Sequence, residues 1–142
     1  MYEEHLKIID ASLKRGIEKR GLHSIAKNLF VLFFEKYPET EKYFEGTVIE
    51  NFCDKKFNII YNFLIDTLRF PAYAEGAICT EVMRHQIYGL KDKEYYFALV
   101  DSLLLSVKIA LDDEWTPEVE EHWGDAATGL KSIIYESAAA YL

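Results

Sequence analysis

Apolar residues recur every three or four positions through the long segments of this chain, and this spacing strongly limits its possible folds. Such spacing places apolar side chains on one face of an α-helix, whereas a half-buried β-strand alternates apolar and polar residues. Only three prolines and seven glycines interrupt the pattern in 142 residues. The sequence therefore predicts an all-α fold.

Six long helices and one short one are expected from this periodicity. Their ranges are about 3–19, 22–36, 38–44 (a short helix or turn), 53–68, 74–88, 94–111 and 117–142. Residues 45–50 are expected to form a loop or frayed linker, and residues 112–114 a solvated turn. No internal repeat or linker divides the chain, so residues 1–142 are predicted to form one domain with one core.

Prolines and glycines mark several helix ends. Tyr37 precedes Pro38, and a residue before proline is pushed out of the α region, so the second helix should stop there. Pro71 should interrupt the chain again, and Gly89 is the expected left-handed stop of the following helix. Thr116, followed by a proline and by acidic residues, is the clearest N-cap in the chain.

The charge balance argues against two classes of partner. The chain has 24 acidic and 16 basic residues, a formal net charge of -8, so its average field should repel nucleic acid and anionic lipid surfaces. No apolar run approaches the roughly 20 residues that a membrane-spanning helix needs. The first five residues lack the basic start and apolar stretch of a signal peptide. We therefore expect a cytoplasmic protein without nucleic-acid or membrane partners.

Aromatic residues make up 15% of the chain, which is more large flat side chain than a small helical core needs. Some of them are therefore expected to line a ligand site. Cys53 and Cys79 lack the spacing of a zinc motif or a disulfide framework, so both are expected to be reduced and mostly buried. His5, His23 and His122 are expected to be surface or helix-end residues.

Three strings, in their order and spacing, resemble the globin family over essentially the whole chain. They are Leu32-Phe33-Phe34-Glu35-Lys36-Tyr37-Pro38-Glu39 followed by Phe44; His85-Gln86-Ile87-Tyr88-Gly89-Leu90 followed by Tyr95-Tyr96 and Leu103-Leu104; and Leu111 to Trp123 with Trp115-Thr116-Pro117-Glu118-Val119 inside it. The second string is similar to the proximal segment of bacterial single-domain globins and of flavohaemoglobins. The resemblance implies a three-over-three helical arrangement and haem b as cofactor.

The resemblance implies that His85 is the proximal ligand of the haem iron, through a neutral imidazole nitrogen. A histidine at a helix end is also compatible with a solvent-facing side chain. The other implied haem-binding residues are Phe30, Phe44, Lys56, Phe57, Ile60, Arg84 and Tyr96. For the apolar members the alternative is plain core packing, and for Arg84, expected to pair with a haem propionate, it is a solvated helix face.

Lys56 occupies the position where a globin usually has a distal histidine or glutamine. Its stem is expected to lie along the pocket, with the ammonium reaching water or a propionate. Two alternatives are that the ammonium donates to a bound gas, or that burial leaves a neutral amine that ligates the iron.

The function implied by the resemblance is reversible binding of a diatomic gas (dioxygen, carbon monoxide or nitric oxide) for storage or sensing, by a monomer or homodimer. One alternative is a haem enzyme acting on nitric oxide or peroxide with electrons from a separate reductase, because nothing in the chain resembles a reductase domain. Another is a haem-free sensor or interaction domain of the same fold. The sequence favours a gas-binding protein over an enzyme.

Overall fold

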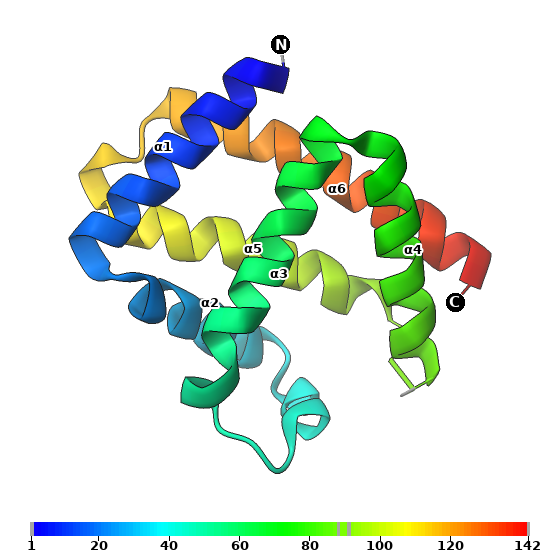
Figure 1. Ribbon diagram of the computed structural model, residues 1–142. Coiled ribbons are helices and arrows are strands. Elements are labelled where there is room, and N and C mark those ends of the chain that lie inside the picture. The colour runs from blue at the N-terminus through cyan, green and yellow to red at the C-terminus, as the bar shows by residue number, and fades with distance from the viewer. Residues whose placement is uncertain (1, 88, 91, 142) are drawn as a thin grey trace.

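The computed structural model describes residues 2–87, 89–90 and 92–141, and these form an all-α chain (Figure 1). The six α-helices are α1 (Tyr2–Arg20), α2 (Leu22–Lys36), α3 (Ile49–Arg69), α4 (Pro71–Ile87), α5 (Lys93–Leu111) and α6 (Pro117–Tyr141). Two short 3-10 helices, η1 (Pro38–Phe44) and η2 (Asp112–Glu114), join them. No β-strand occurs among the described residues, so the all-α prediction is confirmed.

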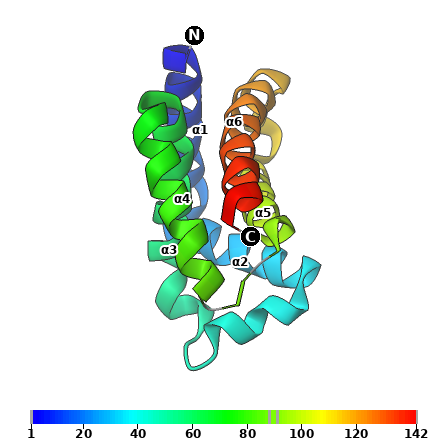
Figure 2. The same ribbon diagram turned by 90° about the vertical axis from the view of Figure 1, so that its right-hand side faces the viewer.

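The helices pack in two layers. Figure 2 shows α1, α3 and α4 on one side of the molecule, with α5 and α6 facing them. Helix α2 packs against α5 in the second layer and against α3 in the first. Helix α3 crosses α5 near the middle of the molecule, and α4 packs on α6 (Figure 1). The two layers therefore bury one continuous apolar core between them.

Trp123 is the largest fully buried side chain of this core. Its indole N–H donates a 2.8 Å hydrogen bond to the Oγ of Ser12, which itself donates to the carbonyl oxygen of Ile9 at 2.8 Å. The indole of α6 is thereby satisfied by a hydroxyl of α1. A buried N–H without such a partner would cost about 1–3 kcal/mol.

Glycines occupy two tight helix ends. Gly21, the single residue between α1 and α2, has φ +83° and ψ 145°, a conformation that is essentially restricted to glycine. Gly89 has φ +86°, and the Leu90 N–H donates back to the carbonyl oxygen of His85 at 3.1 Å. Gly89 is therefore the left-handed stop that the sequence predicts.

Several predicted boundaries shift. Helix α4 begins at Pro71 rather than at Ala74, because proline lacks only an N–H that the first helical turn leaves unpaired anyway. Helix α3 begins at Ile49, so the expected loop is shortened to residues 45–48. The Thr116 N-cap is confirmed by a 3.2 Å bond from the Val119 N–H to its Oγ1. Tyr88 and Leu142, predicted to end helices, lie outside the described residues.

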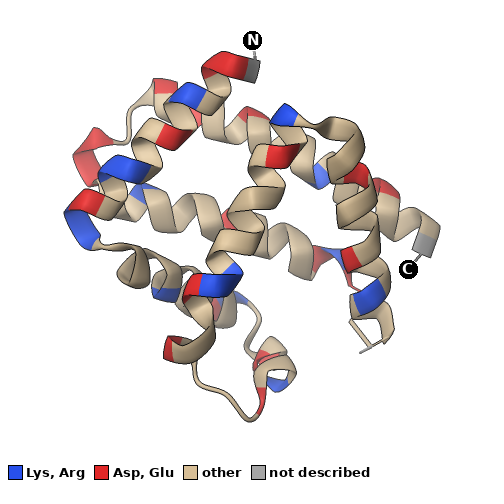
Figure 3. Cartoon of the chain, viewed as in Figure 1, with Lys and Arg blue, Asp and Glu red and all other residues tan. Residues whose placement is uncertain are grey.

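Acidic and basic residues are interspersed along the helices (Figure 3). None of the helices, over the residues that the structure describes, combines the length and the apolarity needed to cross a membrane.

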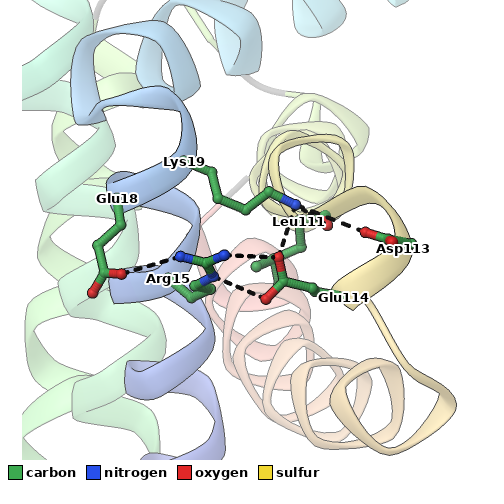
Figure 4. A network of polar contacts seen from close by, with 6 residues as sticks. All are labelled: Arg15, Glu18, Lys19, Leu111, Asp113 and Glu114. Atoms are coloured by element: carbon green, nitrogen blue, oxygen red, sulfur yellow. Dashed lines mark hydrogen bonds and ion pairs between the residues drawn. The ribbon is translucent and has the colours of Figure 1, made fainter.

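One polar network ties the end of α1 to η2 (Figure 4). Arg15 Nε donates to Glu114 Oε1 at 2.9 Å, and Lys19 Nζ lies 3.0 Å from Glu114 Oε2. Hydrogen bonds from Arg15 and Lys19 lower the pKa of Glu114 to about 2. Lys19 also donates to the carbonyl oxygen of Leu111, the last residue of α5, at 2.8 Å.

Candidate functional site: a histidine at the end of α4

His85 lies in the last turn of α4 and its imidazole is held in one orientation. Its Nδ1 is 2.7 Å from the backbone carbonyl oxygen of Glu81, one turn earlier. Because a carbonyl oxygen can only accept, Nδ1 carries the proton of the neutral ring and Nε2 keeps its lone pair. The side chain is 34% exposed, so it is neither a core histidine nor a fully solvated one. This arrangement suits an imidazole that binds a metal through Nε2.

Glu81 also places a carboxylate beside this imidazole, at 3.6 Å from Oε2 to Nδ1. The same carboxylate forms a 2.8 Å ion pair with Arg84, three residues further along the helix. Arg84 is therefore engaged on its own helix, with 56% of its side chain exposed. The role of Glu81 was missed by the sequence analysis, although its position four residues before His85 places both on one helix face.

Tyr96, near the start of α5, faces His85. The two ring centroids are 6.0 Å apart with an interplanar angle of 76°. Its hydroxyl is buried and has no hydrogen-bond partner within the described part of the chain. Burial, and to a smaller extent the charge of Glu81, raises the pKa of Tyr96 to about 12. The hydroxyl therefore remains a proton donor without an acceptor, which is an uncommon and costly state for a buried group.

An aromatic cluster lies where α2, η1 and α3 meet. Phe30 of α2, which is 2% exposed, contacts Phe44 edge-to-face at a centroid distance of 5.7 Å. Phe52 of α3 stacks on Phe44 at 4.7 Å and meets Phe30 at 5.0 Å. Phe30 and Phe44 were predicted at this site from the sequence, whereas Phe52 was not. Its position eight residues before Ile60 on α3 is compatible with the same helix face.

The predicted residues of α3 separate into two environments. Phe57 is fully buried and stacks on Tyr61 at a centroid distance of 6.5 Å, so it belongs to the core. Lys56 and Ile60 are both half-buried and lie four residues apart, which places them on one face of α3.

The eight predicted residues thus form a histidine group (His85, Tyr96 and Arg84) and an aromatic group (Phe30 and Phe44), with Lys56, Phe57 and Ile60 on α3. Within the part of the chain that the structure describes, the two groups share neither a hydrogen bond nor an aromatic ring contact.

The other histidines have different partners. His5 Nδ1 lies 2.7 Å from His122 Nδ1, which joins α1 to α6. His23 Nδ1 lies 2.8 Å from Asp54 Oδ1 and 3.7 Å from Cys53 Sγ. His85 differs from these three because its Nδ1 is held by a backbone carbonyl oxygen. A carbonyl does not titrate, so this hydrogen-bond partner is neutral at any pH.

No protein-family model matches this chain, and no curated protein matches it. The assignment of a function therefore depends on the fold and on the residues described above.

Proposed function

We propose that this protein is a haem-binding globin that reversibly binds a diatomic gas, with His85 as the protein ligand of the iron. The observation that carries the proposal is the 2.7 Å contact between His85 Nδ1 and the Glu81 carbonyl oxygen. It fixes the tautomer and leaves Nε2 as a preoriented donor on a partly exposed ring.

The arrangement of the helices supports the proposal. The layers of α1, α3 and α4 over α2, α5 and α6 are compatible with a three-over-three globin arrangement. The segments that carry the sequence resemblance also lie in compatible elements: residues 38–44 form the short η1, and His85 ends α4. The order of these elements along the chain is therefore compatible with the proposal.

The residues present fit a flat iron porphyrin. His85 supplies the nitrogen, and the ring of Tyr96, whose buried hydroxyl has no partner among the described residues, lies 6.0 Å from the imidazole. The half-buried Phe44, packed on the buried Phe30, supplies aromatic surface, and Ile60 an aliphatic contact, which suit the faces and edges of a macrocycle. When bound, haem iron supplies the position at which the gas binds.

Lys56 is the residue proposed to lie on the gas-binding side. Its half-buried side chain fits a stem that packs against the site with its ammonium at the surface. A lysine held in this way donates no hydrogen bond to a bound gas. We therefore propose that polar stabilisation of dioxygen is weak and that carbon monoxide, which needs less polar assistance, binds well.

The surroundings of His85 favour gas binding over a haem enzyme. A carboxylate bonded to the imidazole would raise its basicity and its electron donation. Here the hydrogen bond goes to a neutral carbonyl, while Arg84 holds the Glu81 carboxylate at 2.8 Å, and Nδ1 lies 3.6 Å from it. The hydrogen bond therefore raises the basicity of the imidazole, and its electron donation to the iron, less than a carboxylate partner would.

Haemin titration of the purified protein tests the proposal. We expect one haem per chain, with a visible spectrum typical of imidazole ligation and a ferrous carbon monoxide complex. His85→Gly should lower haem affinity by more than about 100-fold, because even outer-sphere changes cost about 10- to 100-fold in metal affinity. Free imidazole should restore the wild-type spectrum in that variant.

The control is His122→Ala, which removes a half-buried histidine from α6 and should leave the spectrum unchanged. A protein that stays colourless with haemin would refute the proposal and favour a haem-free domain. Unaltered visible bands in His85→Gly would refute the assignment of the ligand. Turnover of nitric oxide or peroxide with a purified reductase, above that of free haem, would favour the enzyme alternative.

A further inference from the structure

Three different metal-ligating side chains meet between the beginnings of α2 and α3. His23 is the second residue of α2, and Cys53 and Asp54 lie in the first two turns of α3. Their ligand atoms all lie within 4.8 Å of one another. The two cysteines by themselves lack zinc spacing, but the packing of α2 on α3 brings His23 to Cys53, which lies 30 positions later in the chain.

The separations of these atoms approach those around a tetrahedral zinc ion. Bonds of about 2.3 Å to sulfur, 2.05 Å to nitrogen and 2.1 Å to oxygen separate sulfur from either other ligand by about 3.6 Å, and nitrogen from oxygen by about 3.4 Å. The observed separations are 3.7 Å from Cys53 Sγ to His23 Nδ1, 3.4 Å from Sγ to Asp54 Oδ1, and 2.8 Å from Nδ1 to Oδ1. The two separations that involve sulfur agree with the tetrahedral values to within about 0.2 Å, whereas the nitrogen–oxygen separation must lengthen by about 0.6 Å.

That adjustment is accessible because the two side chains concerned are at the surface. The His23 and Asp54 side chains are 52% and 49% exposed, whereas Cys53 is fully buried at the base of the cluster. A cation can therefore enter from solvent and displace the hydrogen bond between imidazole and carboxylate. The exposed side leaves a fourth position for water, as in zinc sites with three protein ligands.

Charge and ligand type select the class of ion. Binding would release the proton of the Cys53 thiol, which donates to Asp54 without the ion, into solvent. The resulting thiolate and one carboxylate neutralise a divalent cation, and the imidazole adds a neutral donor. Thiolate and imidazole together favour zinc-like ions over calcium or magnesium, which prefer oxygen ligands. Glu50, four residues before Asp54 on α3, adds a carboxylate nearby, where it pairs with Lys27 at 2.8 Å.

We propose that His23, Cys53 and Asp54 form a binding site for a zinc-type divalent cation that joins α2 to α3. The site uses none of the residues assigned to haem, so this proposal can be tested independently of the proposed function. Its direct consequence is structural, since one bound ion would link the first turns of two helices that belong to different layers.

Cobalt(II) is the probe, because a thiolate–cobalt bond gives a charge-transfer band that carboxylate or histidine ligation alone does not. The full chain, reduced and stripped of metal, is titrated with cobalt before and after loading with haemin. We expect one cobalt per chain, the thiolate band in both samples, displacement by an equivalent of zinc, and a higher unfolding temperature with zinc.

Cys53→Ser should abolish the band, and the matched variant Cys79→Ser, at the other free cysteine, should retain it. His23→Ala and Asp54→Asn alter half-exposed positions that tolerate substitution, and each should weaken zinc binding by about tenfold or more. They keep the test decisive if the buried Cys53→Ser variant does not fold.

Three results would overturn the proposal: absence of the thiolate band in the wild type, its persistence in Cys53→Ser, or zinc affinity unchanged in both His23→Ala and Asp54→Asn. Because cobalt is measured with and without haemin, loss of haem binding in His85→Gly with the cobalt band retained would separate the two proposals.

Discussion

The hydrogen bond between the Trp123 indole and Ser12 should be a measurable contribution to stability. Ser12→Ala removes the acceptor and leaves the N–H of a fully buried indole without a partner. The lost bond and the desolvation of the N–H cost about 1–3 kcal/mol. Alanine returns part of this, up to about 0.5 kcal/mol, as the better helix former. The net expected loss is therefore about 0.5–3 kcal/mol of the free energy of unfolding.

Urea unfolding followed by far-ultraviolet circular dichroism measures this loss, and a double-mutant cycle isolates its cause. In the Trp123→Phe background there is no indole N–H to satisfy, so Ser12→Ala should change stability by less than about 0.5 kcal/mol. The helix-propensity gain of alanine is common to both backgrounds and cancels, so the coupling energy should be about 1–3 kcal/mol. An equal effect of Ser12→Ala in both backgrounds would show that the hydroxyl acts locally in α1, through its bond to the Ile9 carbonyl, and would refute the reasoning.

Two further predictions concern backbone strain and pH. Gly21→Ala should destabilise the protein by about 1–3 kcal/mol, because φ is +83° there, even though the added methyl group meets no atom. Gly76 is equally open but helical, so Gly76→Ala should stabilise by about 0.4–1 kcal/mol. Equal effects of the two substitutions in chemical denaturation would contradict this reasoning. The folded-state pKa of Glu114, about 2, lies below its ordinary value of 4.5, so the stability it contributes is present above pH 4.5 and is lost as pH falls toward 2. The difference in thermal midpoint between wild type and Glu114→Gln should accordingly shrink from pH 6 to pH 3, and a difference that stays constant would refute the contribution of the ionised carboxylate.

Most helix boundaries could be predicted because they are set locally. The periodicity gave residues 22–36 for the helix observed as α2, and Gly89 and Thr116 end and begin helices through their own backbone or side-chain preferences. The start of α4 was predicted at Ala74 instead of Pro71, because proline is compatible with either a break in a helix or a first helical turn. The choice between these depends on the packing of α4 against α3 and α6, which no local pattern reveals.

The contacts of the candidate site were less predictable than its residue types. Glu81 and His85 are four residues apart on one helix and must therefore lie close together, so this contact could have been predicted from the sequence. The stacking of Phe52 on Phe44 depends on the conformation of the loop at residues 45–48, which sets the direction of α3 relative to η1. The meeting of His23 with Cys53 depends on the crossing of two helices, and long-range crossings are the part of a fold that periodicity leaves open.

Lys19 serves the carboxyl ends of two helices at once. It lies in the last turn of α1 and donates to the terminal carbonyl of α5, so one ammonium faces the negative ends of two helix dipoles (Figure 4). Acetylation of this amine would remove its charge and leave both ends less well compensated. A single covalent change at the protein surface would therefore loosen the first helix and the turn into η2 together.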